Sequence, residues 1–138
     1  MIFLFDRCIA ERLVRMIAVY EIAHTVRYLD DKFDRKTKDV DWITAAAAWE
    51  QPPVVITADN RMRCDPVERQ ALAASKLTIV FLKAGFHDLL IHTQAVKLLT
   101  VWPEIVTETL AVREPTAFEI SPQCKRVELI GRTSKLAN

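Results

Sequence analysis

The chain has 138 residues, of which 51% are hydrophobic, and a formal net charge of +1. This length predicts one domain with a hydrophobic core, and the near-neutral charge excludes a general attraction to nucleic acid or to membranes. The dispersed cysteines Cys8, Cys64 and Cys124 favour neither a disulfide framework nor a zinc site. Only two glycines are present, which excludes glycine-rich phosphate loops. We find no signal-peptide core and no membrane-length apolar run, and therefore expect a cytoplasmic protein.

The predicted elements alternate between strands and helices. Short apolar runs predict buried strands, and apolar residues spaced three and four apart predict helices. The charged segment 30–38 is expected to form a loop. In chain order we predict strand 2–5, helix 7–20, strand 22–29, helix 39–49, strand 54–56, helix 66–75, strand 77–82, helices 88–102 and 103–113, strand 117–120 and an edge strand 127–130.

This order predicts an α/β fold with a mostly parallel central sheet of four to five strands, flanked by helices. The domain is expected to span residues 1–130, and residues 131–138 to form a disordered tail. Pro103 is expected to end one helix and start the next. Asp65 and Glu68 fit a reciprocal capping box around Pro66.

Acidic residues follow two of the strands. Asp6 comes directly after strand 2–5, and Asp59 comes just after the central strand 54–56. If these strands are neighbours in a parallel sheet, the two acids lie roughly 5–7 Å apart. The helix that opens at Asp39 starts from the same edge, so that Asp39 or Asp41 would join them.

Three or four carboxylates in one place repel one another unless a cation neutralises them. Oxygen ligands without histidine or cysteine select Mg²⁺ or Mn²⁺, which act on phosphodiesters. Basic residues near the same edge would contact phosphate: Arg7, Lys38, Arg61 and Arg63. Each acid also has a structural explanation, because Asp is common in turns and at helix starts. Trp42 and Trp49, seven residues apart on one helix, are expected to face the core.

Three segments carry a family resemblance. Ile-Phe-Leu-Phe-Asp-Arg-Cys-Ile at 2–9, Thr-Lys-Asp-Val-Asp-Trp-Ile at 37–43 and Val-Val-Ile-Thr-Ala-Asp-Asn-Arg-Met-Arg at 54–63 resemble the PIN-like nucleases. The branch that they resemble most is the VapC-type toxins. The resemblance covers roughly residues 1–120.

The resemblance implies a Rossmann-like, three-layer α/β/α fold that binds Mg²⁺ or Mn²⁺ and hydrolyses RNA. It also implies a cognate antitoxin that holds the toxin inactive, and a homodimer. By position, Asp6, Asp59 and one of Asp39 and Asp41 match the acids of the family. Where larger PIN domains carry a further acid, this chain has the basic Arg61–Arg63 segment, which predicts a sparse metal site.

Two other classes remain open. A catalytically silent PIN-like interaction module would use its acids as caps and the apolar face of residues 89–112 for a partner. A receiver-like signalling domain also places acids after its first and third strands and binds Mg²⁺. This chain, however, has Arg7 where such domains have a second acid after strand one, and it lacks the expected Lys at the end of strand five.

Overall fold

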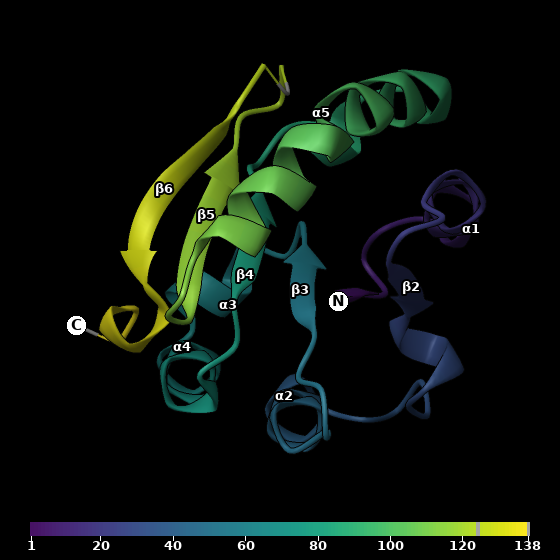
Figure 1. Ribbon diagram of the computed structural model, residues 1–138. Coiled ribbons are helices and arrows are strands. Elements are labelled where there is room, and N and C mark those ends of the chain that lie inside the picture. Colours follow the sequence, from purple (N-terminus) through teal and green to yellow (C-terminus); the bar gives the residue numbers. More distant parts are fainter. Residues whose placement is uncertain (124, 138) are drawn as a thin grey trace.

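The computed structural model describes residues 1–123 and 125–137, so Cys124 and Asn138 lie outside the described residues. Strands and helices largely alternate along the chain (Figure 1). The strands are β1 (Ile2–Phe5), β2 (Thr25–Tyr28), β3 (Val54–Thr57), β4 (Ile79–Leu82), β5 (Thr116–Ile120) and β6 (Val127–Arg132). The α-helices are α1 (Glu11–Tyr20), α2 (Asp39–Ala47), α3 (Arg61–Cys64), α4 (Pro66–Ser75) and α5 (Ile91–Ala111), and 3₁₀ turns occupy Leu29–Asp31, Phe86–Asp88 and Thr133–Lys135.

The strands form one sheet in the order β2-β1-β3-β4-β5-β6. The first five strands are parallel to their neighbours, and β6 pairs antiparallel with β5. The sheet therefore has six strands where four to five were expected, because β6 pairs back along the whole of β5. The mostly parallel α/β fold predicted from the sequence is confirmed.

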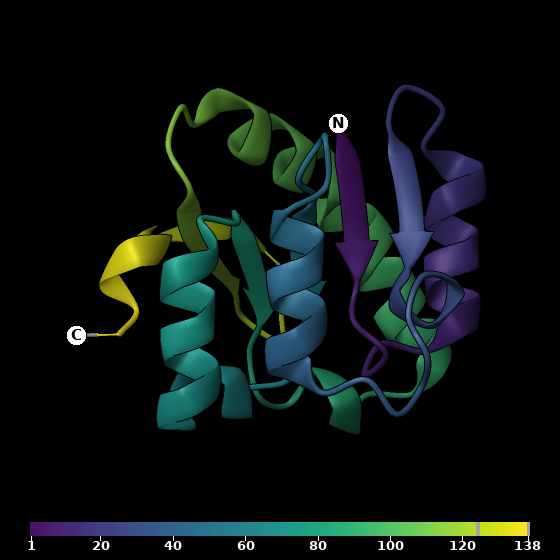
Figure 2. The ribbon, with the colours of Figure 1, turned by 90° about the horizontal axis from the view of Figure 1, so that it is seen from below.

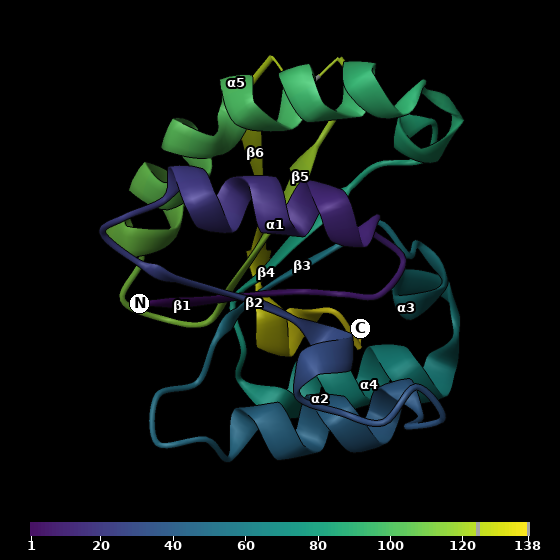
Figure 3. The same ribbon diagram turned by 90° about the vertical axis from the view of Figure 1, so that its right-hand side faces the viewer.

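Helices cover both faces of the sheet. The helices α2 and α4 lie side by side over one face (Figure 2), and α1 and α5 cover the other (Figure 3). The strands are buried on both sides because successive side chains point to opposite faces. In β1, Phe3 and Phe5 enter the core under α1 and α5, while Leu4 enters the core under α2 and α4.

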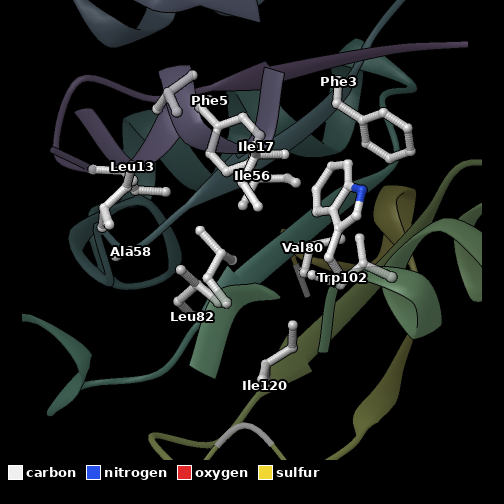
Figure 4. Packing of buried hydrophobic residues seen from close by; sticks show 14 of the residues in the cluster. Phe3, Phe5, Leu13, Ile17, Ile56, Ala58, Val80, Leu82, Trp102 and Ile120 are labelled. Atoms are coloured by element: carbon white, nitrogen blue, oxygen red, sulfur yellow. The ribbon is translucent and has the colours of Figure 1, made fainter. Parts of the chain in front are cut away.

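Aromatic packing fixes the long helix α5 on the sheet. Trp102 is 1% exposed and packs edge-on against Phe3, with 4.8 Å between ring centroids (Figure 4). The prediction that Pro103 ends the helix is wrong, because α5 is continuous from Ile91 to Ala111. Proline costs the helix one backbone hydrogen bond. Trp102 and Ile105, on either side of Pro103, are both buried in the same core, which favours continuing the helix across it.

The end of the chain differs from the disordered tail expected for residues 131–138. Strand β6 continues to Arg132, and Thr133–Lys135 form a 3₁₀ turn. Thr133 is buried and donates its hydroxyl to the Leu77 carbonyl at 2.6 Å. This anchors the segment against the core under α4. No helix in the described parts of the chain has both the length and the apolar character needed to cross a membrane.

Candidate functional site

The carboxyl ends of β1 and β3 bring two of the predicted acids to one edge. The two strands are parallel neighbours, with Phe5 opposite Ile56, and the Asp6 amide extends the ladder by donating to the Ile56 carbonyl at 2.9 Å. Asp59 follows two residues after the end of β3, and α2 begins at Asp39. The neighbouring strands expected from the sequence are therefore present.

These residues line one hollow of about 670 Å³, which we call the acidic hollow. It lies at the edge of the sheet where ligands bind in open parallel α/β folds. Its lining residues are Asp6, Arg7, Cys8, Thr37, Lys38, Asp39, Val40, Asp59, Arg61, Asp65, Val67 and Glu68.

Asp6 is the most buried acid of the hollow, with 2% of its surface exposed. Its carboxylate accepts hydrogen bonds from the Thr57 hydroxyl at 2.8 Å and from the Arg7 amide at 2.7 Å. Burial raises the pKa of Asp6, and the nearby charge of Asp39 raises it further, while these hydrogen bonds oppose the rise. A bound cation would relieve both causes of the shift.

Thr57 joins the two strand-end acids. Its hydroxyl donates to Oδ2 of Asp6 and accepts a hydrogen bond from the Asp59 amide at 3.0 Å. One fully buried side chain therefore sets the position of both acids. Thr57 was not among the site residues predicted from the sequence. The signal that could have found it is its place at the last position of β3, opposite Asp6.

Cys8 is close to the same network. The Ala58 amide donates to its sulfur at 3.3 Å, and the sulfur lies 3.5 Å from Oδ2 of Asp6. Burial, followed by the charge of Asp6, raises the pKa of Cys8 to about 12. The thiol is therefore protonated at neutral pH and lacks the thiolate that nucleophilic chemistry requires.

The two acids of α2 lie in different surroundings. Asp39 lines the acidic hollow and accepts a hydrogen bond from the indole of the buried Trp42 at 2.8 Å. Asp41 is exposed and is not among the lining residues. Asp39 is also not the N-cap that the sequence allowed, because Lys38 holds that position.

Asp59 is held by a nearby cation. Nε and Nη2 of Arg61 donate to its two carboxylate oxygens, with Nη2 at 2.8 Å from Oδ2. The hydrogen bonds from Arg61 lower the pKa of Asp59. Asp59 is therefore a charged carboxylate whose two oxygens are already engaged.

Glu68 is a site residue that the capping-box interpretation concealed. Asp65 does cap α4, because its carboxylate accepts from the amides of Val67 and Glu68. The return half of the box is absent, since the Asp65 amide donates to the Arg61 carbonyl at 2.7 Å. Oε2 of Glu68 is instead buried in the acidic hollow, with no hydrogen-bond partner among the described residues.

The carboxyl group of Glu68 lies against that of Asp39. Burial and then the charge of Asp39 raise the pKa of Glu68. Two carboxyl groups can share a hydrogen bond only when one of them carries a proton. Glu68 and Asp39 are thus a like-charged pair that favours either a proton or a cation between them.

A family model described as a PIN like domain matches residues 1–84. The chain belongs to the PIN-like domain family. The match spans β1 to β4 and includes every acid of the hollow. Searches of the curated proteins and of the solved structures each found no match. PIN-like domains are a nuclease-type family whose members typically bind divalent metals.

The acids of this PIN-like domain carry the oxygen ligands that such a metal prefers, but the described part of the chain does not bring three of them together. The hollow offers oxygen ligands from Asp6, Asp39, Asp59 and Glu68, which suit Mg²⁺ or Mn²⁺. The unpartnered Oε2 of Glu68 and the raised pKa of Asp6 both favour a cation. Within residues 1–123 and 125–137, however, no three such side chains are grouped closely enough to hold an ion.

Three of the four basic residues predicted to contact phosphate line the acidic hollow, and Arg63 does not. Arg61 and Lys38 line the acidic hollow of this PIN-like domain and extend into solvent. Arg7 also lines it, but its guanidinium donates to the carbonyls of Arg35 and Thr37 and pairs with Asp30, so that it fastens the loop before α2.

Arg63 does not line the acidic hollow. It forms an ion pair with Glu119 of β5 at 3.0 Å and lies over the Phe81 ring. Its position next to Arg61 in sequence suggested a shared role, but α3 turns the two side chains to different sides.

Proposed function

We propose that this PIN-like domain is a metal-dependent endoribonuclease. The observation that carries the proposal is the buried Asp6 carboxylate, oriented by Thr57 and lying in one hollow with Asp39, Asp59 and Glu68. Buried like charges are costly, and their presence at a ligand-binding edge favours a functional role. Lys38 and Arg61 add positive charge beside them, as binding of a phosphate backbone requires.

Mg²⁺ or Mn²⁺ would be held by Asp6, Asp39 and Asp59, and when bound it supplies positive charge that stabilises the negative charge developing on the phosphodiester. Lys38 and Arg61 bind the phosphates on either side and fix the strand in the hollow. Oε2 of Glu68 accepts a proton from the attacking water, a role that suits a carboxylate whose pKa is raised by burial and by the charge of Asp39. Thr57 keeps Asp6 and Asp59 in register.

The deciding experiment compares the wild type with Asp6→Asn. Purified proteins are incubated with mixed single-stranded RNA and Mn²⁺, and cleavage is followed on gels while circular dichroism reports the fold. We expect Mn²⁺-dependent cleavage by the wild type and none by a folded Asp6→Asn variant. Equal activity of the two proteins would overturn the proposal.

Metal binding is measured separately by thermal unfolding with Mn²⁺ and with EDTA. A ligand that binds only the native state raises the midpoint by mass action. We expect Mn²⁺ to raise the midpoint of the wild type and to leave that of Asp59→Asn nearly unchanged. The matched control is Asp41→Asn, because Asp41 is exposed outside the acidic hollow and its loss should leave the Mn²⁺ effect intact.

We further propose that the chain is the toxin of a toxin–antitoxin pair, as its resemblance to VapC-type proteins implies. Expression should then arrest bacterial growth, and Asp6→Asn should not. A cognate antitoxin would relieve the arrest, and sedimentation of the purified chain would detect the homodimer that the resemblance also implies. Normal growth during wild-type expression would remove the toxin role without removing the ribonuclease.

A silent interaction module is the second candidate. The specific observation that favours it is the ion pair of Arg61 with Asp59, which occupies both oxygens of one predicted ligand. Several side chains of α5 are also exposed and apolar, among them Val96 and Leu110, which would suit a protein partner. This candidate predicts no effect of Mn²⁺ on unfolding, whereas the nuclease predicts stabilisation. The family match favours both the nuclease and the silent interaction module over the receiver-like signalling domain.

A further inference from the structure

A second hollow lies on the same face of the sheet as α2, outside the acidic hollow. It has a volume of about 460 Å³ and includes Phe33, Trp49 and the two cations Arg27 and Lys32. We call it the aromatic hollow. Ile2, at the start of β1, also lines it, so it lies toward the opposite end of β1 from Asp6.

The aromatic floor of this hollow is pre-organised. The rings of Phe33 and Trp49 are parallel to within 2°, with 6.0 Å between their centroids. Both rings pack against the core under α2, which fixes their orientation. The sequence predicted that both tryptophans of this helix face the core. Trp42 does so with 0% exposure, but Trp49 is only half-buried and its remaining surface lines the hollow.

The cations of the aromatic hollow are available to a ligand. Asp31, which directly precedes Lys32 in sequence, is bound on both carboxylate oxygens by Arg15. In the described part of the chain neither Arg27 nor Lys32 forms an ion pair, and both are exposed. The hollow thus combines a flat aromatic surface with two cations, Arg27 and Lys32, and one acid, Glu50.

Two further lining residues supply hydrogen-bonding groups. Glu50 and Gln51 follow α2 and line the same hollow. A carboxylate accepts hydrogen bonds from the amino group of a base, and an amide both donates and accepts. Aromatic stacking surface, cations for phosphate and an acceptor for a base edge are together the chemistry that recognises one nucleotide.

A basic segment links the two hollows. Residues 32–38, with the sequence Lys-Phe-Asp-Arg-Lys-Thr-Lys, contain four cations and one acid. Phe33 and Lys32 line the aromatic hollow, while Thr37 and Lys38 line the acidic hollow. In Figure 2 this segment connects the 3₁₀ turn after β2 to the start of α2.

We propose that the aromatic hollow binds a nucleotide of a single-stranded RNA whose scissile phosphate lies in the acidic hollow. The base stacks on Trp49 beside Phe33, its edge meets Glu50 and Gln51, and its phosphate meets Arg27 and Lys32. The RNA backbone follows residues 32–38 between the two hollows. This inference deepens the proposed ribonuclease function and rests on it.

Tryptophan fluorescence tests the inference without cleavage. The described tryptophans Trp42 and Trp102 are 0% and 1% exposed, so quenching by a solution ligand reports Trp49. A short single-stranded ribo-oligonucleotide is titrated into the full chain in EDTA. We expect saturable quenching, unchanged in Asp41→Asn, because Asp41 is exposed and lines neither hollow, and lost in Trp49→Phe, which keeps an aromatic ring in place of the reporter.

Charge-reversal variants locate the phosphate contacts, and binding is followed by anisotropy of a labelled oligonucleotide. Arg27→Glu combined with Lys32→Glu should weaken binding about tenfold or more at low salt and reduce the salt dependence by roughly one ion per cation removed. Arg12→Glu is the control, because Arg12 is an exposed cation of α1 on the other face of the sheet. An oligonucleotide with abasic positions should quench less, because stacking is lost.

The outcomes separate the inference from the function on which it rests. Cleavage of RNA together with binding that ignores the Arg27 and Lys32 changes would overturn the inference and leave the ribonuclease intact. Equal binding of abasic and intact oligonucleotides would also overturn it. RNA that is neither bound nor cleaved would remove both proposals.

Discussion

Arg61 holds Asp59 through both carboxylate oxygens, with Nη2 2.8 Å from Oδ2. The pair places a cation of the protein at one of the residues proposed to bind a metal. The Arg61 side chain is 82% exposed while that of Asp59 is 12% exposed, so the arginine is the partner that a solution ligand reaches first. A phosphate that attracts Arg61 would free Asp59, so we expect RNA and metal to bind cooperatively.

Removing this competing cation should tighten metal binding. We expect Arg61→Gln to lower the Kd for Mn²⁺ by up to about fivefold, the scale of an exposed ion pair, when calorimetry is done without RNA. The same change should weaken RNA binding, because a phosphate contact is lost. Arg63→Gln is the matched control, since Arg63 pairs with Glu119 outside the acidic hollow. Weaker Mn²⁺ binding in Arg61→Gln would show that the arginine supports the metal site.

Thr57 should matter for stability as well as for activity. Thr57→Val keeps the shape of the side chain but leaves the buried Asp6 carboxylate without its 2.8 Å donor. An unsatisfied buried group costs about 1–3 kcal/mol, which urea unfolding at neutral pH would measure. Thr44→Val serves as the control, because its hydroxyl only bonds the Val40 carbonyl on the exposed side of α2. Equal losses in the two variants would mean that Thr57 does not position Asp6.

The raised pKa of Glu68 makes the free energy of unfolding depend on pH in a defined direction. Its pKa is raised above the ordinary value of 4.5, so the folded state binds the proton more tightly than the unfolded chain. The group therefore destabilises the fold as the pH rises from 4.5 through its folded pKa, and the penalty is complete above it. Glu68→Gln should raise the free energy of unfolding by about 0.5–1 kcal/mol at pH 7.5.

This gain should shrink as the pH falls toward 4.5, where Glu68 of the wild type is protonated as well. Urea unfolding across this range, without added metal, measures the difference. Glu108→Gln, on the exposed side of α5, is the matched control for the loss of one carboxylate. Destabilisation by Glu68→Gln at neutral pH would contradict the repulsion between Glu68 and Asp39.

The two described cysteines should differ in reactivity. The pKa of Cys8 is raised to about 12 by burial and by Asp6, whereas Cys64 is exposed. Since the thiolate is the reactive form, iodoacetamide at pH 7.5 should modify Cys64 and spare Cys8. Mass spectrometry of the separate peptides would show the difference, and denatured protein should react at both. Rapid modification of native Cys8 would mean that the network around Asp6 opens in solution.

Local patterns in the sequence determined most of the strands and the position of Asp6 and Asp59 at one edge of the sheet. Runs such as Val54–Ile56 are apolar on both faces, which requires a strand covered on both sides. Asp6 and Asp59 follow such runs, and parallel strands deliver their ends to one edge, so their meeting could be predicted. The family resemblance of the N-terminal segments likewise depends only on residue order.

Tertiary packing decided the rest. Pro103 lies within one helix because Trp102 and Ile105 are buried on the same sheet face, and no local signal reports that burial. Glu68 joins the acidic hollow because α4 packs beside α2, which overrides a capping pattern that looked sufficient. Trp49 packs against the core and also lines the aromatic hollow, where Phe33, from a loop distant in sequence, stacks against it. Such contacts depend on which elements become neighbours, and that information lies in the fold and not in any single stretch of residues.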